Sequence, residues 1–387
     1  MNILIYNIIH LFIFPFFLFF FGFRFLFKKE NVNSFLQKLL SAGSVNNYDY
    51  IIHVASIGEL NSINFIIKEI FTNKKILITC STLSSYQLAI NKYAQFKIQY
   101  LPYDFYPLVN IFLTKNKTDK FIWIDSEIWP NYLYALRARN IKTYLINARI
   151  SEKSFVRWKL ASTFIKDLGS VYKDIYASSL GDKKKFEILL KRKVFFCENL
   201  KFYQKLNILT KNKKNLCFAS VHLQEYGDIA KIISKIKLNN IDKIYIIPRH
   251  PQYISILSNE LSKNNVSSEK IIVLNEIGKN KEIYSISKVT FMGGSLFIHG
   301  GQNPLEALSC GSYILTGPHI SNFSSIYNEL ESQKLCGVFK EIDHNLISNL
   351  IDKIMNETEL LDINKIEYLF NKKIKKLREI TNKISND

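Results

Sequence analysis

Cysteine is scarce in this sequence, and its placement excludes two kinds of stabilising site. Five cysteines are spread over 387 residues, and no two of them form a CxxC pair. An odd number of widely separated cysteines argues against a disulfide framework and against a zinc site, and it fits a reducing compartment. We expect most of these thiols to be small core residues.

Several nucleotide-binding and nucleic-acid-binding signatures are also missing. The sequence has no GxxxxGK[ST] and no GxGxxG, which disfavours an NTPase or a dinucleotide enzyme. It has no RNA-binding signature of the RRM type and no zinc-finger spacing, so nucleic acid is not a favoured partner. The formal net charge of +19 favours anionic partners such as phosphates or acidic lipid headgroups. Abundant Lys, Asn and Ile is, however, also what an AT-rich genome would impose.

The N-terminus is the clearest outlier in composition. Residues 3–27 form an apolar run that exceeds the roughly 20 residues needed to cross a membrane, and Lys28 and Lys29 follow it. No positive segment precedes the run and no A-x-A site follows, unlike a cleaved signal peptide. We predict a membrane anchor over residues 1–29, either a tilted span or a helix in one leaflet, with a buried core helix as the alternative. The basic residues after the run favour a cytoplasmic body, and removal of the anchor should leave the rest folded.

The remainder alternates short apolar runs with longer amphipathic stretches. This alternation is typical of parallel sheets with crossover helices. Expected strands are residues 50–55, 75–80, 121–124, 143–147, 216–219, 243–248, 270–274, 289–292 and 312–315, and expected helices include 61–71, 132–140, 223–236, 255–264, 304–309 and 324–332.

Two such series in tandem suggest an α/β chain with two Rossmann-like domains facing a cleft. We place the N-terminal domain at residues 30–200 and the C-terminal domain at 201–387, with a Lys- and Asn-rich linker at 206–215. The helical pattern of residues 345–387 predicts C-terminal helices that pack across the domains.

Acidic residues follow two of the predicted strands of the first series. Glu59 stands in Ser56-Ile57-Gly58-Glu59, just after the strand at 50–55, and Asp125 and Glu127 follow the strand at 121–124. Ligands of open α/β sheets bind at the carboxyl ends of strands, so Glu59 is a candidate general base. A carboxylate in a first helical turn is also favoured by the helix dipole, so simple capping remains an alternative at both places.

The second series offers two candidate ligand-binding blocks. Arg249 and His250 stand between two prolines at the end of a predicted strand, where an arginine suits bidentate contact with phosphate or carboxylate. The glycine-rich stretch 293–301 leads to Asn303, Pro304 and Glu306, which we expect at the N-cap, N1 and N3 positions of a helix in a capping-box arrangement. The free N–H groups of such a helix start bind phosphate well.

Taken together and in order, these blocks resemble the 3-deoxy-D-manno-octulosonic acid (Kdo) transferases of lipopolysaccharide synthesis, a family with the GT-B fold. The stretches that carry the resemblance are HVASIGE, YLPYD at 100–104, DSEIWPN, INARISEKS at 146–154, NLKF at 199–202, PRHP, FMGGSLFIHGGQNPLEAL and GPHISNF at 317–323.

The resemblance implies an inverting transferase that uses neither a metal nor a cofactor. Glu59 matches the family's catalytic base, and Lys201 together with Asp125 or Glu127 matches positions that steady the transition state. The residues that match the family's CMP-contacting positions are Arg249, His250, Ile277, Gly278, Lys279, Asn303, Pro304, Leu305 and Glu306.

This chain departs from the family's usual pattern at several positions. Lys279 replaces a usual Glu, Gln302 stands where His is usual, and Asp125 stands for the first Glu of ETE. Val221 and Gln224 depart from STHPGE, whereas Ser220, His222 and Glu225 remain.

We therefore expect a glycosyltransferase at the cytoplasmic side of the cell inner membrane. It would move Kdo from CMP-Kdo to the lipid A precursor lipid IVA, in contact with inner membrane lipids. The alternatives are another GT-B envelope enzyme that uses a UDP-sugar, such as a lipid A disaccharide synthase, and a membrane-bound homologue that has lost catalysis.

Overall fold

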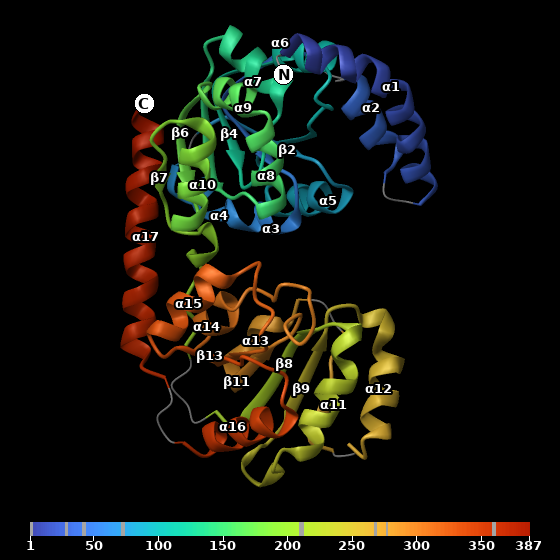
Figure 1. Ribbon diagram of the computed structural model, residues 1–387, viewed down its shortest axis with the longest axis vertical. Helices are drawn as coiled ribbons and strands as arrows, with labels where there is room; N and C mark the ends of the chain where they lie inside the picture. Colours follow the sequence, from blue (N-terminus) through green and yellow to red (C-terminus); the bar gives the residue numbers. More distant parts are fainter. Residues whose placement is uncertain are drawn as a thin grey trace. The chain divides into compact units, whose positions relative to one another are not determined.

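A computed structural model describes residues 3–27, 30–40, 44–70, 74–208, 213–266, 269–275, 278–357 and 361–387 (Figure 1). Three residues named above, Lys28, Lys29 and Ile277, lie outside these ranges. The chain divides into two compact units. The first comprises Met1–Tyr203 with Lys373–Asp387, and the second comprises Gln204–Lys372.

The first unit is built on a seven-stranded parallel sheet in the order β3-β2-β1-β4-β5-β6-β7. Along β4, Phe121 and Trp123 enter one hydrophobic core while Ile122 and Ile124 enter another. Successive side chains of a strand point to opposite faces, so the sheet is buried on both sides, as expected of parallel strands that are apolar throughout. The strands are β1 (Asn46–Val54), β2 (Ile76–Cys80), β3 (Lys97–Tyr100), β4 (Asn116–Ile124), β5 (Lys142–Ala148), β6 (Tyr172–Ala177) and β7 (Phe195–Phe196).

Helices on both faces supply the other half of each core. One face is covered by residues such as Leu133 and Phe186, and the other by residues such as Ile66. The helices are α2 (Val32–Leu40), α3 (Ile57–Ser62), α4 (Asn64–Ile70), α5 (Leu83–Lys92), α6 (Tyr106–Lys115), α7 (Pro130–Ala138), α8 (Glu152–Leu160), α9 (Ser162–Gly169) and α10 (Leu180–Leu190), with a 3-10 turn at Leu200–Phe202.

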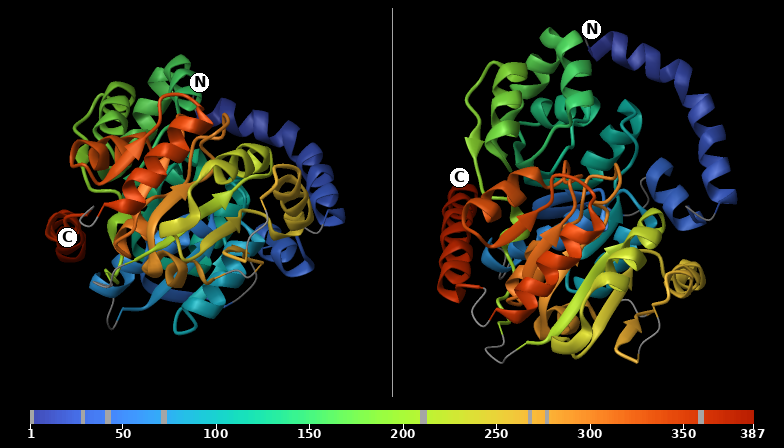
Figure 2. Two further views of the ribbon diagram at one scale, coloured as in Figure 1. Left: turned by 90° about the horizontal axis from the view of Figure 1, so that it is seen from below. Right: turned by 60° about the horizontal axis from the view of Figure 1, so that its bottom comes forward.

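The N-terminal apolar run forms helix α1 (Ile3–Leu26). Its first turns are attached to the first unit: Ile3 and Tyr6 pack against one of the cores, and Phe14 stacks on Phe105 with ring centroids 4.5 Å apart. Figures 1 and 2 show the rest of α1 standing away from the sheet. The expectation that this run leaves the core untouched is therefore wrong. Within the described ranges, no helix combines the length and the apolar character needed to cross a membrane.

The second unit contains a six-stranded parallel sheet in the order β10-β9-β8-β11-β12-β13. Its core gathers Phe218 and Phe291 from neighbouring strands and Ile229 and Ile351 from helices. The strands are β8 (Asn215–Val221), β9 (Ile244–Pro248), β10 (Ile271–Val273), β11 (Ser287–Met292), β12 (Tyr313–Thr316) and β13 (Cys336–Val338). The helices are α11 (Tyr226–Lys235), α12 (Ile254–Lys263), α13 (Asn280–Ile286), α14 (Leu305–Ser309), α15 (Ser324–Ser332) and α16 (His344–Asn356), and 3-10 turns include Leu223–Glu225 and Pro251–Tyr253.

The final helix, α17 (Ile363–Asn386), changes the expected division of the chain. Its Leu377 and Ile384 are buried in a core of the first unit, and Lys383 pairs with Asp174 of β6 at 2.8 Å. Residues 373–387 therefore belong to the first unit and not to the C-terminal domain. Lys201 belongs to the first unit too, because neighbouring Leu200 is buried in the same core.

Candidate active site

Glu59 lies at the turn between β1 and α3, where β1 reaches its carboxyl end. Its backbone N–H donates to Ser56 Oγ at 3.3 Å, and its own carboxylate accepts from the backbone N–H of Ala55 at 2.6 Å and from Ser56 Oγ at 3.0 Å. The side chain therefore caps the start of α3, as the simpler interpretation held. This cap also fixes the carboxyl group at the sheet edge where ligands of α/β folds bind.

The surroundings of Glu59 favour its protonated form. Burial raises the pKa of Glu59 to about 8, and the nearby charge of Asp125 adds to this effect, while the hydrogen bond from Ala55 opposes it. The residue itself keeps intermediate solvent exposure. A carboxyl group that is accessible and has a pKa near neutrality is suited to proton transfer.

Asp125 lies at the carboxyl end of β4, in a conformation held by its neighbour β5. Its φ of 64° is in the left-handed region, which is unusual for a residue other than glycine. Its backbone N–H donates to Ile146 O at 3.0 Å and its carbonyl accepts from Arg149 N at 3.2 Å. Asn147 Nδ2 donates to its carboxylate. Burial raises the pKa of Asp125, and the Asn147 bond and the charge of Arg149 oppose this.

Glu127 follows two residues later and is held from both ends. Trp129 Nε1 donates to its carboxylate, and the hydroxyl of Tyr172 donates to its backbone carbonyl at 2.9 Å. Burial raises the pKa of Glu127 to about 7, and the charge of Asp125 adds to the rise. His53 Nε2 lies 3.9 Å from the carboxylate, but burial lowers the pKa of His53 to about 3, so this histidine is neutral and forms no ion pair.

Lys201 brings a positive charge to this group of acids. It lies in the 3-10 turn after Asn199, whose side chain accepts from the Lys201 backbone N–H at 3.0 Å. The turn is attached to β5, because Leu200 N donates to Asn147 Oδ1 at 3.2 Å. Burial lowers the pKa of Lys201 and the charge of Arg149 lowers it further, while the carboxylates of Asp125 and Glu59 raise it.

The four predicted catalytic positions therefore lie together in one unit. Each of the acids Glu59, Asp125 and Glu127 has a raised pKa, about 8 for Glu59 and about 7 for Glu127. A cluster of this kind can accept a proton from a hydroxyl, and the cations beside it can stabilise developing negative charge.

In the second unit, a buried glutamate organises the glycine-rich loop after β11. Glu225 is fully buried, and its two carboxylate oxygens accept four backbone N–H bonds. The donors are His222 at 2.9 Å, Gly294 at 2.7 Å, Ser295 at 2.9 Å and Leu296 at 2.9 Å. Glycine is required next to this clamp, because a Cβ at Gly293 would lie 2.7 Å from the backbone oxygen of Ser220.

A group of histidines surrounds this loop. The ring of His222 lies 4.1 Å from that of His299 and 6.1 Å from that of His250, measured between centroids. Burial lowers the pKa of His222 to about 4, with further contributions from His299 and then Arg249. His222 is thus neutral, and its Nε2 lies 3.1 Å from Nε2 of Gln302, where it accepts a hydrogen bond from the amide.

Arg249 and His250 are exposed at the carboxyl end of β9, as their sequence position predicts. The backbone N–H of Arg249 donates to Val221 O at 2.8 Å, which fixes the loop against β8. Arg249 is close enough to lower the pKa of His222, so the structure brings Arg249 and His250 beside the glycine-rich loop.

The Asn303–Glu306 block differs in detail from the sequence expectation. Helix α14 begins at Leu305 with Pro304 at the N-cap, one position later than expected, and it has no capping box. Asn303 Oδ1 still accepts from Leu305 N at 3.2 Å. Leu305 is fully buried. Glu306 lies 4.0 Å from Lys281 Nζ, and burial raises its pKa.

The other predicted loop reaches this helix through Lys281. Gly278 has a φ of 104°, which favours glycine, and Lys279 occupies the N-cap of α13. The contact between Lys281 and Glu306 places the start of α13 next to the start of α14. This positions Gly278 and Lys279 in the neighbourhood of Asn303 and Glu306.

Three residues of these sites were not named as functional candidates from the sequence. They are Asn147, which joins Asp125 to the Lys201 turn, Arg149, whose Nη1 lies 3.8 Å from Asp125 Oδ2, and Glu225. Asn147 and Arg149 occur in the stretch 146–154, which carries the family resemblance, and Glu225 is a retained position of the block that otherwise departs from STHPGE. This was the available signal. Over the described ranges, no group of three or more His, Cys, Asp or Glu side chains is arranged to hold a metal ion.

The two parallel-sheet units define a GT-B-like α/β protein, and solved structures with this fold match over most of the chain. A glycosyltransferase from Rickettsia africae matches with a TM-score of 0.56 at 13% identity, covering 88% of this chain and 93% of that one. A UDP-GlcNAc 2-epimerase from Neisseria meningitidis matches with a TM-score of 0.54 at 12% identity, covering 85% and 99%.

Sequence comparison narrows this class to one family. Residues 24–204 match the family model described as 3-deoxy-D-manno-octulosonic-acid transferase (kdotransferase). A 3-deoxy-D-manno-octulosonic acid transferase of Rickettsia bellii is 32% identical over 332 residues, which cover 78% of this chain and 79% of that protein. A bifunctional glycosyltransferase/methyltransferase of Fusobacterium nucleatum is 28% identical over 348 residues, and the chain spans only 54% of it. The chain belongs to the Kdo transferase family.

Proposed function

We propose that this chain transfers Kdo from CMP-Kdo to a hydroxyl of a lipid A precursor, lipid IVA, with inversion at the anomeric carbon. Family membership supports the sugar and the reaction class. The observation that carries the proposal is the group formed by Glu59, Asp125, Glu127 and Lys201 at the carboxyl edge of the first sheet.

In the proposed step, the acceptor hydroxyl oxygen forms a bond to the anomeric carbon of Kdo. The bond from that carbon to the phosphate oxygen of CMP breaks, CMP leaves with the electron pair, and the hydroxyl proton passes to ionised Glu59. The capping bonds from Ala55 and Ser56 hold the carboxylate in place for this transfer. Lys201 offsets the negative charge of the acids near the reacting atoms.

The donor would bind the second unit. Arg249 would contact the phosphate of CMP, and the Asn303–Glu306 turn would hold the nucleoside, with the loop clamped by Glu225 between them. Because His222 is neutral, its ring adds no positive charge to this site, and phosphate recognition would depend on Arg249 and neighbouring lysines.

We further propose that α1 attaches the protein to the cytoplasmic side of the inner membrane as a helix lying in the interface. Phe12, Phe16 and Phe19 are 72%, 77% and 81% exposed, and their spacing of three to four residues places them on one face. Burial of each such side chain in lipid contributes about 1.5–3 kcal/mol. The acceptor is itself a lipid, so attachment would keep the enzyme where its substrate is.

The decisive experiment is mass spectrometry of the products formed from a tetra-acylated lipid A precursor with CMP-Kdo and, in parallel, with UDP-sugars. We expect the mass of the precursor to increase by Kdo with CMP-Kdo only. Addition of a sugar from a UDP donor would favour the rival GT-B activity. Binding of CMP without any transfer would favour a homologue that has lost catalysis.

A further inference from the structure

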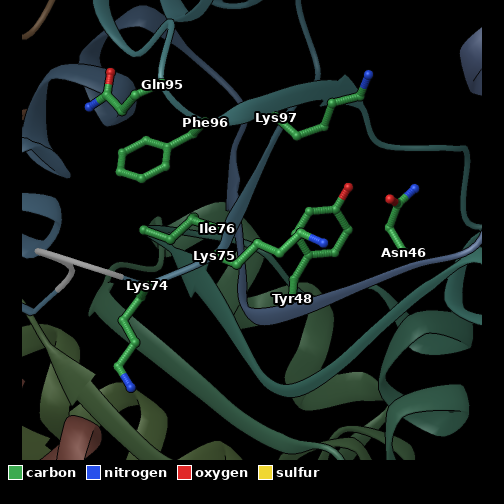
Figure 3. A pocket seen from close by; sticks show the side chains of 8 residues that line it. All are labelled: Asn46, Tyr48, Lys74, Lys75, Ile76, Gln95, Phe96 and Lys97. Carbon is green, nitrogen blue, oxygen red and sulfur yellow. The ribbon is translucent and has the colours of Figure 1, made fainter.

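A concave site lies on the first unit, away from the acid cluster. It is a cavity of about 500 Å³ (Figure 3). Its apolar lining comes from Tyr48, Ile76 and Phe96, and its charged lining from Lys74, Lys75 and Lys97.

The position of this cavity follows from the topology of the sheet. Tyr48 lies near the start of β1, Lys75 precedes β2, and Lys97 begins β3. Parallel strands all start at one edge of a sheet, so the cavity is at the amino edge, whereas Glu59 follows the carboxyl end of β1. The six residue steps from Tyr48 to Val54 span roughly 20 Å at about 3.3 Å each, so the two sites are separate.

The positive charge at this cavity exceeds that of the acids beside it. None of the lining residues is acidic, and among the ion pairs between described residues none involves Lys74, Lys75 or Lys97. One carboxylate is nearby, that of Asp49, which accepts the backbone N–H of Lys75 at 2.7 Å, so three lysines face a single acid. Elsewhere on this unit, lysines such as Lys183 are paired with carboxylates.

The lining combines these cations with hydrogen-bond donors and a firm floor. Tyr48 and Ile76 are buried, and Lys75 Nζ lies 5.3 Å from the ring centroid of Tyr48. Figure 3 shows Lys75 running across this ring, with Lys74 and Lys97 on different sides of the cavity. The amides of Asn46 and Gln95 also line it. Flexible ammonium groups and neutral hydrogen-bond donors, in a lining without acidic residues, are suited to binding phosphate.

We propose that this cavity binds a phosphate group, carried either by a small soluble molecule or by a lipid headgroup. The site is independent of the donor site and of the proposed transfer, because it shares no residue with either. A phosphate entering the cavity would draw the ammonium groups of Lys74, Lys75 and Lys97 toward itself.

The test is calorimetric titration of the full chain with pyrophosphate at low salt, with CMP present to occupy the donor site. The variant carries Lys74→Gln, Lys75→Gln and Lys97→Gln. The control carries Lys231→Gln, Lys235→Gln and Lys353→Gln, which removes three charges from exposed positions of α11 and α16. We expect pyrophosphate affinity to fall at least about tenfold in the pocket variant, which is the scale for loss of hydrogen bonds to charged groups. The control should change little.

A second arm identifies the source of the phosphate. The wild type, the pocket variant and the control, all of which keep α1, are sedimented with phosphatidylglycerol vesicles and, separately, with phosphatidylcholine vesicles. The fraction of protein bound to the two kinds of vesicle is compared. A pocket-specific loss of pyrophosphate binding supports a soluble ligand, and a pocket-specific loss of phosphatidylglycerol binding alone supports a headgroup.

Two outcomes would overturn the proposal. One is a pocket variant that binds both probes as the control does. The other concerns the matched variant in which the same three lysines become arginine. This variant keeps the charge, so binding as weak as that of the glutamine variant would show that shape and not charge was lost.

Discussion

At the scale of single residues, Glu59 shows that capping and catalysis are compatible roles. The sequence allowed both interpretations. In the structure Glu59 does cap α3, because its carboxylate accepts hydrogen bonds from the Ala55 N–H and the Ser56 hydroxyl. What the sequence could not predict is the environment. The raised pKa depends on burial and on Asp125, which is 66 positions away along the chain but directly follows the neighbouring strand β4.

Replacement of Glu59 by glutamine tests its role as the base. General-base catalysis contributes about 10²–10⁴-fold, so Glu59→Gln should reduce turnover by that factor while CMP affinity persists. Glu379→Gln, on an exposed position of α17, is the control and should retain turnover. A mere capping role predicts a small loss of stability with near-normal turnover, and that result would end the assignment of Glu59 as the base.

The pH dependence provides an independent test of the same group. Only ionised Glu59 can accept a proton, and its pKa is raised to about 8, so turnover should rise with pH and level off above about 8. Stability should follow the opposite trend. The folded state holds this proton up to a higher pH than the unfolded state does, so wild-type stability should fall relative to Glu59→Gln as pH rises from about 4.5 to about 8. A turnover profile that is flat between pH 6 and 9 would contradict this.

Arg249 is the residue-scale test of the donor site. The Arg249 side chain is exposed, and the loop is held to Val221 by the Arg249 backbone N–H, which an alanine keeps. The variant Arg249→Ala should therefore leave thermal unfolding nearly unchanged. CMP affinity should weaken by about 1.5–3 kcal/mol, the scale of a hydrogen bond to a charged group. The matched change Lys235→Ala on α11 should leave CMP affinity intact. Equal protection of wild type and Arg249→Ala by CMP against heat would show that the assignment is wrong.

At the scale of elements, the strands that the sequence predicted are those with continuous apolar runs. The expected strands in β1, β2, β4, β5, β8, β9, β10, β11 and β12 are found, with shifted ends. Strands β3, β6, β7 and β13 were not predicted, and β7 is only two residues long. Lysine or glutamine interrupts the apolar pattern of β3, Lys173 and Asp174 interrupt β6, and β13 is three residues long with a central glycine. Pairing with neighbouring strands decides these segments, and a local pattern does not contain that information.

The loop clamped by Glu225 illustrates the same limit and allows a prediction. Its acceptor bonds reach 69 to 71 positions along the chain. In Glu225→Gln, one oxygen becomes an NH₂ group, so two of the four backbone N–H groups lose their acceptor. Each loss costs about 1–3 kcal/mol in a buried site. We expect a lower unfolding midpoint and weaker CMP binding, measured by thermal unfolding with and without CMP. Glu269→Gln, which is exposed, is the control, and equal behaviour of the two variants would contradict the clamp.

A hydrogen bond joins helix α1 to Asp104, whose carboxylate contacts the start of α7. The Tyr6 hydroxyl donates to Asp104 Oδ2 at 2.8 Å, and the Asp104 carboxylate also accepts from the backbone N–H groups of Asn131 and Tyr132 at the start of α7. Tyr6→Phe removes that donor and should loosen α1, which hydrogen exchange over residues 3–16 would measure. Tyr368→Phe, at an exposed position, should have no effect there. Unchanged exchange in Tyr6→Phe would mean that apolar packing alone attaches α1.

At the scale of the whole molecule, the attachment of α1 to the first unit changes how membrane binding must be tested. Deletion of residues 1–29 would remove Ile3 and Tyr6 from a hydrophobic core and would leave Asp104 without one of its donors. A deletion variant could then fail by unfolding, so its loss from membranes would not identify the anchor. Substitutions confined to the exposed face avoid this problem.

We therefore predict the outcome of Phe12→Ser, Phe16→Ser and Phe19→Ser in one protein. These side chains are largely exposed, so unfolding of the purified protein should change little. Each substitution removes about 1.5–3 kcal/mol of apolar burial in lipid, which together should shift most of the protein from the membrane fraction to the supernatant at high salt. The control Leu160→Ser, Leu180→Ser and Ile298→Ser alters equally exposed apolar positions outside α1 and should remain membrane-bound.

High salt screens the attraction between basic residues and acidic headgroups, so retention that is seen only at low salt measures that attraction alone. Full retention of the α1 variant at high salt would show that another surface anchors the protein.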